Sequence, residues 1–186
     1  MSTPAAAPTG ETALIIECPA AEAAVGRHRA RYDWAAGVGV PAHFTVVYPF
    51  RPVDALTVGD HERLADLFEA EPAFRVHGSR TAWFADQVLY VPPDDPEPIL
   101  DLIAAVTAAF PDRPPYGGAH DTVVPHLTVG HDSPVAALQD AERDVLRALP
   151  FVQDVTTVAL WRGPAPGSDP GSEPGSWRRV RGYALG

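Results

Sequence analysis

The sequence predicts a single α+β domain of two pseudo-symmetric lobes, each an antiparallel or mixed sheet with helices outside, around a central cleft. Three observations support this prediction. Strand-like segments alternate with amphipathic helical segments along the chain. The order strand–helix–strand occurs twice, which indicates an approximate internal duplication. Each copy also contains one His-x-Thr motif, at residues 43–45 (HFT) and 126–128 (HLT), 83 positions apart.

Length and composition are typical of one globular domain with an ordinary core. The chain has 186 residues, of which 46% are hydrophobic and 20% charged. We expect a flexible tail over residues 1–11, without the features of a secretion signal, and one domain over residues 12–186. The only cysteine, Cys18, excludes an intramolecular disulfide and a cysteine-based metal cage, and it ends an apolar segment like a buried small hydrophobe. Together these features predict a cytoplasmic protein.

The charged residues narrow the choice of partners. All 14 basic residues are arginines, which excludes a Schiff-base lysine and a P-loop lysine. The net charge is −10, so a long nucleic acid would be repelled at long range. No apolar run approaches the length of a membrane span. We therefore expect a small-molecule substrate, anionic or neutral, and no membrane partner; the sequence makes no prediction of the oligomeric state.

The first half of the chain contains the first motif. In order, the pattern predicts an apolar strand over residues 12–18, an Ala-rich helix over 20–32, a turn-rich segment over 37–41 and a strand over 43–50. Asp60 is placed to cap a short helix that carries Leu64, Leu67 and Phe68 on one side. Two strands are expected to follow, over residues 74–80 and 81–91, with a bend between them.

The second half repeats the pattern around the second motif. Ile99, Leu102, Ile103, Val106 and Phe110 follow helical spacing, and residues 111–121 are irregular. A strand over 124–130 carries the second motif, and Ser133 followed by Pro134 predicts a capped helix start. We expect two further strands, over 155–161 and 177–185, separated by a flexible Gly/Pro/Ser-rich loop over 163–176.

The two motifs carry the candidate chemistry. In a strand, residues i and i+2 face the same side, so His43 lies beside Thr45 and His126 beside Thr128. If the two strands are neighbours, two imidazoles and two hydroxyls converge on one cleft. Such a set can transfer protons and hold an anion without a metal or a cofactor. A single strand histidine is more often structural, but packing alone does not explain two matched pairs.

The flanks of the motifs resemble the 2H phosphoesterase superfamily, often labelled 2′-5′ RNA ligase-like. The resemblance covers nearly the whole chain and is strongest at residues 40–50 (VPAHFTVVYPF), 114–120 (PPYGGAH) and 124–130 (VPHLTVG). It implies a bilobal fold with a pseudo-twofold axis. It also implies metal-independent chemistry on phosphodiesters, often 2′,3′-cyclic or 2′-5′-linked nucleotides.

From the motifs we expect His43 and His126 to be the catalytic acid and base, in an order that the sequence leaves open. Thr45 and Thr128 are placed to donate hydrogen bonds to phosphoryl oxygens. A loop before the second motif could fold over the substrate, with Tyr116 and His120 as substrate-binding residues. No metal ligand set and no cofactor are expected, because threonine is a weak metal ligand.

Several other residues are expected to be structural. Regular alternation places Tyr48 on the face opposite His43, in the core, and it places His131 at a solvated strand end. Arg179 and Arg181 share a face of the last strand, which favours a solvated edge over a phosphate contact. The four tryptophans are expected in the core or in the cleft wall.

Three functions stay open at this point. The first is a phosphodiesterase that hydrolyses a small cyclic or 2′-5′-linked nucleotide or an RNA end. The second keeps the fold and the histidine pair for elimination, addition or cyclisation of a non-phosphorylated metabolite. The third is a non-catalytic nucleotide-binding module, which two matched imidazoles argue against. Arginines that reach the cleft would favour phosphoester chemistry, and an apolar, aromatic cleft would favour the second function.

Overall fold

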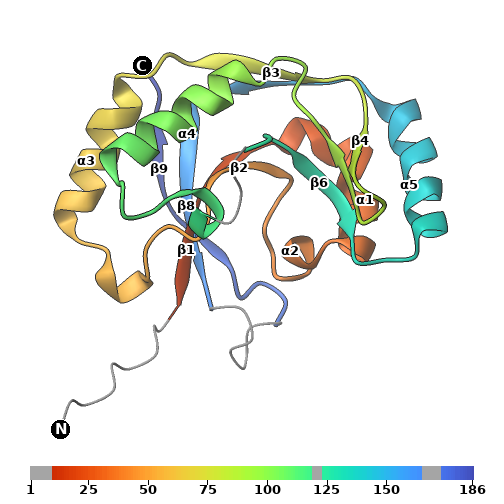
Figure 1. The fold of residues 1–186 in the computed structure, drawn as a ribbon, viewed down its shortest axis with the longest axis horizontal. Coiled ribbons are helices and arrows are strands. Elements are labelled where there is room, and N and C mark those ends of the chain that lie inside the picture. Colours follow the sequence, from red (N-terminus) through yellow and green to blue (C-terminus); the bar gives the residue numbers. More distant parts are fainter. Residues whose placement is uncertain (1–9, 119–122, 165–172) are drawn as a thin grey trace, which may run out of the picture.

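The computed structural model describes residues 10–118, 123–164 and 173–186 (Figure 1). Most of the predicted tail (residues 1–11), His120 and the middle of the predicted 163–176 loop lie outside the described residues. In the described ranges no helix is both long and apolar enough to cross a bilayer.

Nine strands form three antiparallel sheets in the described part of the chain, which confirms the α+β class. The four-stranded sheet has the order β2-β1-β8-β9, with β1 at Glu11–Glu17, β2 at His43–Val47, β8 at Thr157–Gly163 and β9 at Arg178–Ala184. The three-stranded sheet has the order β4-β5-β6, at Ala82–Phe84, Val88–Val91 and Leu127–His131. A separate pair joins β3 (Phe74–Gly78) to β7 (Phe151–Val155).

The helix that precedes each motif strand packs against the motif strand of the other half of the chain. Helix α1 (Glu22–Tyr32) links β1 to β2 but packs against β6, and α4 (Glu97–Ala109) links β5 to β6 but packs against β2. Figure 1 shows α3 (Val58–Glu69) and α4 beside the four-stranded sheet, with α1 and α5 (Val135–Ala148) beside β6. Each strand–helix–strand unit therefore covers the sheet of the other unit. This exchange places both motif strands at the centre of the molecule, and β2 contacts β6 directly.

Short helical turns complete the connections. They are η1 (Pro19–Ala21), α2 (Trp34–Gly37), η2 (Val53–Ala55) and η3 (Pro115–Gly118). Helix α2 follows α1 directly and leads to the segment before β2. Asp33 caps α2 by accepting a hydrogen bond from the Ala35 N–H at 3.0 Å.

Strand β1 is buried on both faces, which explains its continuous apolar run. Leu14 and Ile16 belong to the main core, which the helices cover. Ala13 and Ile15 point to the other face and join a smaller cluster that includes Trp161. Successive side chains of a strand alternate between faces, so one strand supplies both clusters. The smaller cluster forms one wall of the candidate site described below.

Several predicted boundaries were wrong, for local reasons. Asp60 does not cap α3: Thr57 is the N-cap, and Asp60 is the third helical residue of a reciprocal capping box. Ser133 does not cap α5, because its hydroxyl donates to the His131 carbonyl at 3.1 Å instead. The expected strand over residues 81–91 is split by a turn into β4 and β5, and β7 was missed.

Candidate active site

The two His-x-Thr motifs have the same local geometry. His43 is the first residue of β2, and His126 stands immediately before β6. In both motifs the histidine and the threonine are partly exposed, while the residue between them, Phe44 or Leu127, is fully buried. The histidine and the threonine of each motif therefore share the outer face of their strand, as the sequence predicted.

Each histidine ring is held by the same hydrogen bond. His43 Nδ1 donates to the Pro41 carbonyl at 2.8 Å, and His126 Nδ1 donates to the Val124 carbonyl at 2.8 Å. A carbonyl oxygen only accepts, so Nδ1 carries the hydrogen in both rings. In the neutral ring Nε2 is then the nitrogen with the lone pair. The two imidazoles thus present the same nitrogen for proton exchange.

The backbone before His43 is fixed by two neighbouring elements. The Ala42 carbonyl accepts a hydrogen bond from the Cys18 N–H at 2.7 Å, just after β1. The Ala42 N–H donates to Glu22 Oε1, in the first turn of α1, at 2.6 Å. Both polar groups of this residue's backbone are therefore satisfied inside the protein. His43 enters its strand at a position that the rest of the fold determines.

Electrostatics favours the neutral form of both histidines. Burial, then the Arg29 guanidinium, lower the pKa of His43 from 6.5 to about 4, against the opposing effects of the Pro41 carbonyl and Asp33. The charge of His126 lowers the pKa of His43 further, so the two rings are close enough to influence each other. Burial also lowers the pKa of His126. The strands that follow these histidines are also neighbours, because β2 contacts β6 directly.

Aromatic rings surround His126. The Phe84 ring meets it edge-on with 5.1 Å between centroids, and the Tyr90 ring lies 5.7 Å away at 68°. Phe84 and Tyr90 stack on each other at 4.2 Å. Thr128 lies opposite Tyr90 in the β5–β6 ladder. This apolar surface supplies the burial that disfavours the His126 cation.

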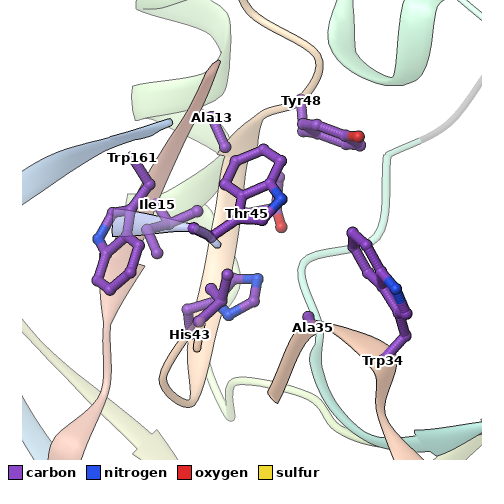
Figure 2. Close-up of a pocket in the computed structure, with 10 residues that line it drawn as sticks. Ala13, Ile15, Trp34, Ala35, His43, Thr45, Tyr48 and Trp161 are labelled. Carbon is purple, nitrogen blue, oxygen red and sulfur yellow. The ribbon is translucent and has the colours of Figure 1, made fainter. Parts of the chain in front are cut away.

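His43 and Thr45 line a pocket of about 90 Å³ with aromatic walls (Figure 2). Figure 2 shows both side chains between Trp161 and Trp34, with Tyr48 above them. The remaining lining residues are Ala13, Ile15, Ala35, Val40 and Trp177. None of the ten described residues that line this pocket is an arginine or an acid. Its surface suits a flat, apolar group more than a phosphate.

Tyr48 lines this pocket, and the prediction that it lies on the opposite face was wrong. The ladder between β1 and β2 contains a bulge, with Leu14 opposite Val47 but Ile15 opposite Thr45. A bulge adds one residue to a strand, so alternation shifts by one position after it. Tyr48 therefore returns to the face of Thr45, where its hydroxyl donates to Glu11 Oε2 at 2.7 Å.

The loop before the second motif is described in part. Tyr116 belongs to η3, which contacts β2 near the first motif. The Tyr116 side chain and His120 fall outside what the structure describes, so their predicted role in substrate binding stays a prediction. Among the described residues, no group of three or more His, Cys, Asp or Glu side chains is arranged to hold a metal ion.

The predictions for Cys18 and for the arginines of β9 were confirmed, and the prediction for His131 was wrong. Cys18 is buried, and burial raises the pKa of its thiol to about 12, so it is not an activated nucleophile. The arginines of β9 belong to the sheet edge: Arg179 Nε lies 3.1 Å from Glu17 Oε1, and Arg181 lies over the Tyr183 ring. His131 is no solvated strand end, because its ring is partly buried between Asp33 and Asp132.

Comparisons with known proteins agree with this geometry. A family model described as the 2′-5′ RNA ligase superfamily matches residues 17–165. No curated protein sequence is a significant match.

Solved structures of similar shape include E. coli LigT complexed with NADP+, at 15% identity and a TM-score of 0.57 over 96% of this chain and 99% of that one. LigT complexed with 3′-AMP gives 14% identity and a TM-score of 0.56 over 95% and 98%. The protein TT0787 of Thermus thermophilus gives 19% identity and a TM-score of 0.59 over 94% and 97%. At these identities the structural matches establish a shared fold.

Proposed function

Because the chain belongs to the 2′-5′ RNA ligase superfamily of 2H phosphoesterases, we propose that it is a phosphodiesterase whose acid–base pair is His43 and His126. The observation that carries this proposal is that the rings of His43 and His126 are held in the same orientation. Each histidine directs Nδ1 to a backbone carbonyl at 2.8 Å, and the two rings influence each other electrostatically. A structural role for either histidine alone would not require the other to have the same orientation.

The proposed reaction is hydrolysis of a cyclic phosphodiester. His43 Nε2 takes a proton from water as the water oxygen forms a bond to phosphorus. The bond from phosphorus to one ribose oxygen breaks, and protonated His126 donates its Nε2 hydrogen to that oxygen. His43 ends protonated and His126 neutral, and proton exchange with solvent restores both. Thr45 and Thr128 donate hydrogen bonds to the phosphoryl oxygens, where negative charge increases in the transition state.

The Arg29 guanidinium supports one order of acid and base. Its guanidinium favours the neutral form of His43, and a general base must be neutral to accept a proton. We therefore assign His43 as the base and His126 as the acid in the hydrolytic direction; because burial also lowers the pKa of His126, the acid is the minor, protonated form of its ring. Acid–base catalysis by one such group typically contributes about 10²–10⁴-fold to the rate.

The proposed substrate is a small nucleotide or a short phosphodiester. LigT, which shares the fold, has been crystallised with NADP+, 3′-AMP and phosphate. The aromatic pocket beside His43 would hold a base by stacking, since every base has a flat π-face. Tyr116 and His120, on the loop before the second motif, remain candidates for contacts with the same substrate. The net charge of −10 favours such a small ligand over a long nucleic acid.

One observation favours a second candidate function. The pocket beside His43 has apolar and aromatic walls and no arginine among its ten described lining residues. Such a surface also suits elimination, addition or cyclisation of a non-phosphorylated metabolite by the same histidine pair. The two candidates differ in whether the ligand carries phosphate.

Turnover assays separate these candidates. The purified protein would be tested, with EDTA present, on 2′,3′-cyclic nucleotides, 2′-5′ dinucleotides and ADP-ribose cyclic phosphate. Variants His43→Ala and His126→Ala would be compared with His77→Ala, which removes an exposed imidazole from β3.

We expect turnover in the parent and in His77→Ala, with a loss of at least about 10²-fold in each motif variant. Turnover that survives either motif substitution would refute the two-histidine mechanism. Absence of turnover on the whole panel would instead favour the second candidate function.

A further inference from the structure

We propose that Asp33 is a positioning residue that joins the two motif strands through an ionic bridge, formed by the buried Arg29 and Asp33 and the partly exposed His131 and called the Asp33 bridge below. Arg29 and Asp33 lie at the end of α1, and His131 is the last residue of β6. None of the three belongs to a His-x-Thr motif. The effect of the bridge on catalysis rests on the proposed function, whereas the coupling of the strands does not.

The first part of the bridge holds the segment that enters β2. Arg29 is 2% exposed and Asp33 is 6% exposed. Arg29 Nε donates to Asp33 Oδ2 at 2.9 Å, and Arg29 Nη2 lies 2.8 Å from the same oxygen in an ion pair. The same Nη2 donates to the Val40 carbonyl at 3.2 Å, three residues before His43. The ion pair is therefore attached directly to the backbone that positions the first motif.

The second part of the bridge reaches the other motif strand. The second oxygen of Asp33, Oδ1, lies 3.6 Å from His131 Nε2. His131 stands three residues after Thr128 on the same strand, and its Nδ1 lies 2.8 Å from Asp132 Oδ2. One carboxylate thus contacts a cation from each half of the molecule.

The surroundings keep His131 charged. Asp33 faces it from the start of α2, Asp132 follows it in the chain, and Arg29 lies beyond Asp33. The neighbouring strand β5 presents apolar Val88 opposite His131. The Asp33 carboxylate in the ion pair, and then the hydrogen bond to Asp132, raise the pKa of His131 to about 9, against the cost of partial burial. The bridge is therefore complete at neutral pH.

Packing alone would hold β6 against α1, so the fold does not need the bridge for contact. Gly130 lies so close to this helix that an added Cβ would be 2.6 Å from Tyr32 Cβ. Buried ion pairs are often no more stabilising than apolar side chains of the same volume. A charged bridge with a buried Arg29–Asp33 pair between the two motif strands is better explained by positional accuracy, because misplacement by about 1 Å can cost about 10²-fold in rate.

The Asp33 bridge predicts that two variants shift the pKa of His43 in opposite directions. These shifts can be measured without a substrate. His131→Gln removes the cation that faces Asp33, so the Asp33 charge acts more strongly on His43 and raises its pKa. Asp33→Asn removes that charge, so the pKa of His43 falls and that of His131 falls toward 6.5. Titration of the histidine ring protons by NMR in the full chain measures each of these values.

The matched control is Asp132→Asn, which removes the exposed carboxylate on the other side of the His131 ring. Asp132 has a positive φ of 50°, a conformation that Asn tolerates. We expect Asp33→Asn and His131→Gln to lower kcat by about 10- to 100-fold with a smaller effect on KM. Asp132→Asn should stay within about twofold of the parent.

An unchanged pKa of His43 in folded His131→Gln would overturn the proposal, whether or not a substrate has been found. Equal losses of kcat in Asp132→Asn and His131→Gln would also overturn it. If Asp33→Asn does not fold, His131→Gln decides, because its ring lies at the partly exposed end of β6. A failure of the proposed function would show instead as no turnover in the parent, with the His43 shifts still present.

Discussion

Acid should destabilise this protein through His43, and the variant His43→Gln isolates that effect. In the folded protein the pKa of His43 is about 4, whereas in the unfolded chain it returns to about 6.5. As pH falls below 6.5, the unfolded chain takes up a proton that the folded protein refuses, so stability declines until pH reaches about 4. Above pH 6.5 the ring is neutral in both states and this contribution to stability is complete.

The size of the effect follows from the pKa difference between 6.5 and about 4. Each pKa unit corresponds to about 1.4 kcal/mol, so the full difference would correspond to about 3 kcal/mol. The ring is partly exposed, and solvent screening reduces that figure. We therefore expect about 2 kcal/mol of stability to be lost between pH 7.5 and pH 4 because of His43 alone.

Urea denaturation at both pH values measures this contribution. Gln at position 43 places an amide where the imidazole stood, and this amide does not titrate. All other titratable groups are common to the two proteins, so their effects cancel in the comparison. The parent should lose about 2 kcal/mol more stability than His43→Gln on going to low pH. Equal losses in the two proteins would refute the conclusion that the fold holds His43 neutral.

Three further results are expected. Thr45→Val and Thr128→Val should each lower kcat by about 10²-fold or more with little change in KM, measured by steady-state kinetics, because each removes a donor to the transition state. Trp34→Ala should weaken nucleotide binding by about 1–3 kcal/mol in calorimetry, yet hardly change thermal stability, since Trp34 lines the pocket and is 42% exposed. Gly130→Ala should destabilise the fold by about 1–3 kcal/mol in denaturation, because its Cβ would overlap Tyr32; unchanged stability would contradict the close packing of β6 on α1.

Local patterns accounted for most of the secondary structure. The alternation of buried and partly exposed residues around His43 and His126 follows from the period of a strand, and it correctly placed each threonine on the face of its histidine. Amphipathic spacing likewise identified α4. The predicted caps at the starts of α3 and α5 were wrong, because a single side chain there selects between competing hydrogen bonds, as at Thr57 and Ser133.

The sequence by itself determined the α+β class, the two motif strands and the residue types available for proton transfer, because these depend on neighbours within a few positions along the chain. Only the tertiary structure decided that α1 and α4 exchange partners, that a bulge returns Tyr48 to the face of Thr45, and that Asp33 meets His131. Asp33 and His131 are almost a hundred positions apart. Contacts of this kind depend on how helices and sheets pack together, and no periodicity within either segment encodes the partner that it will meet.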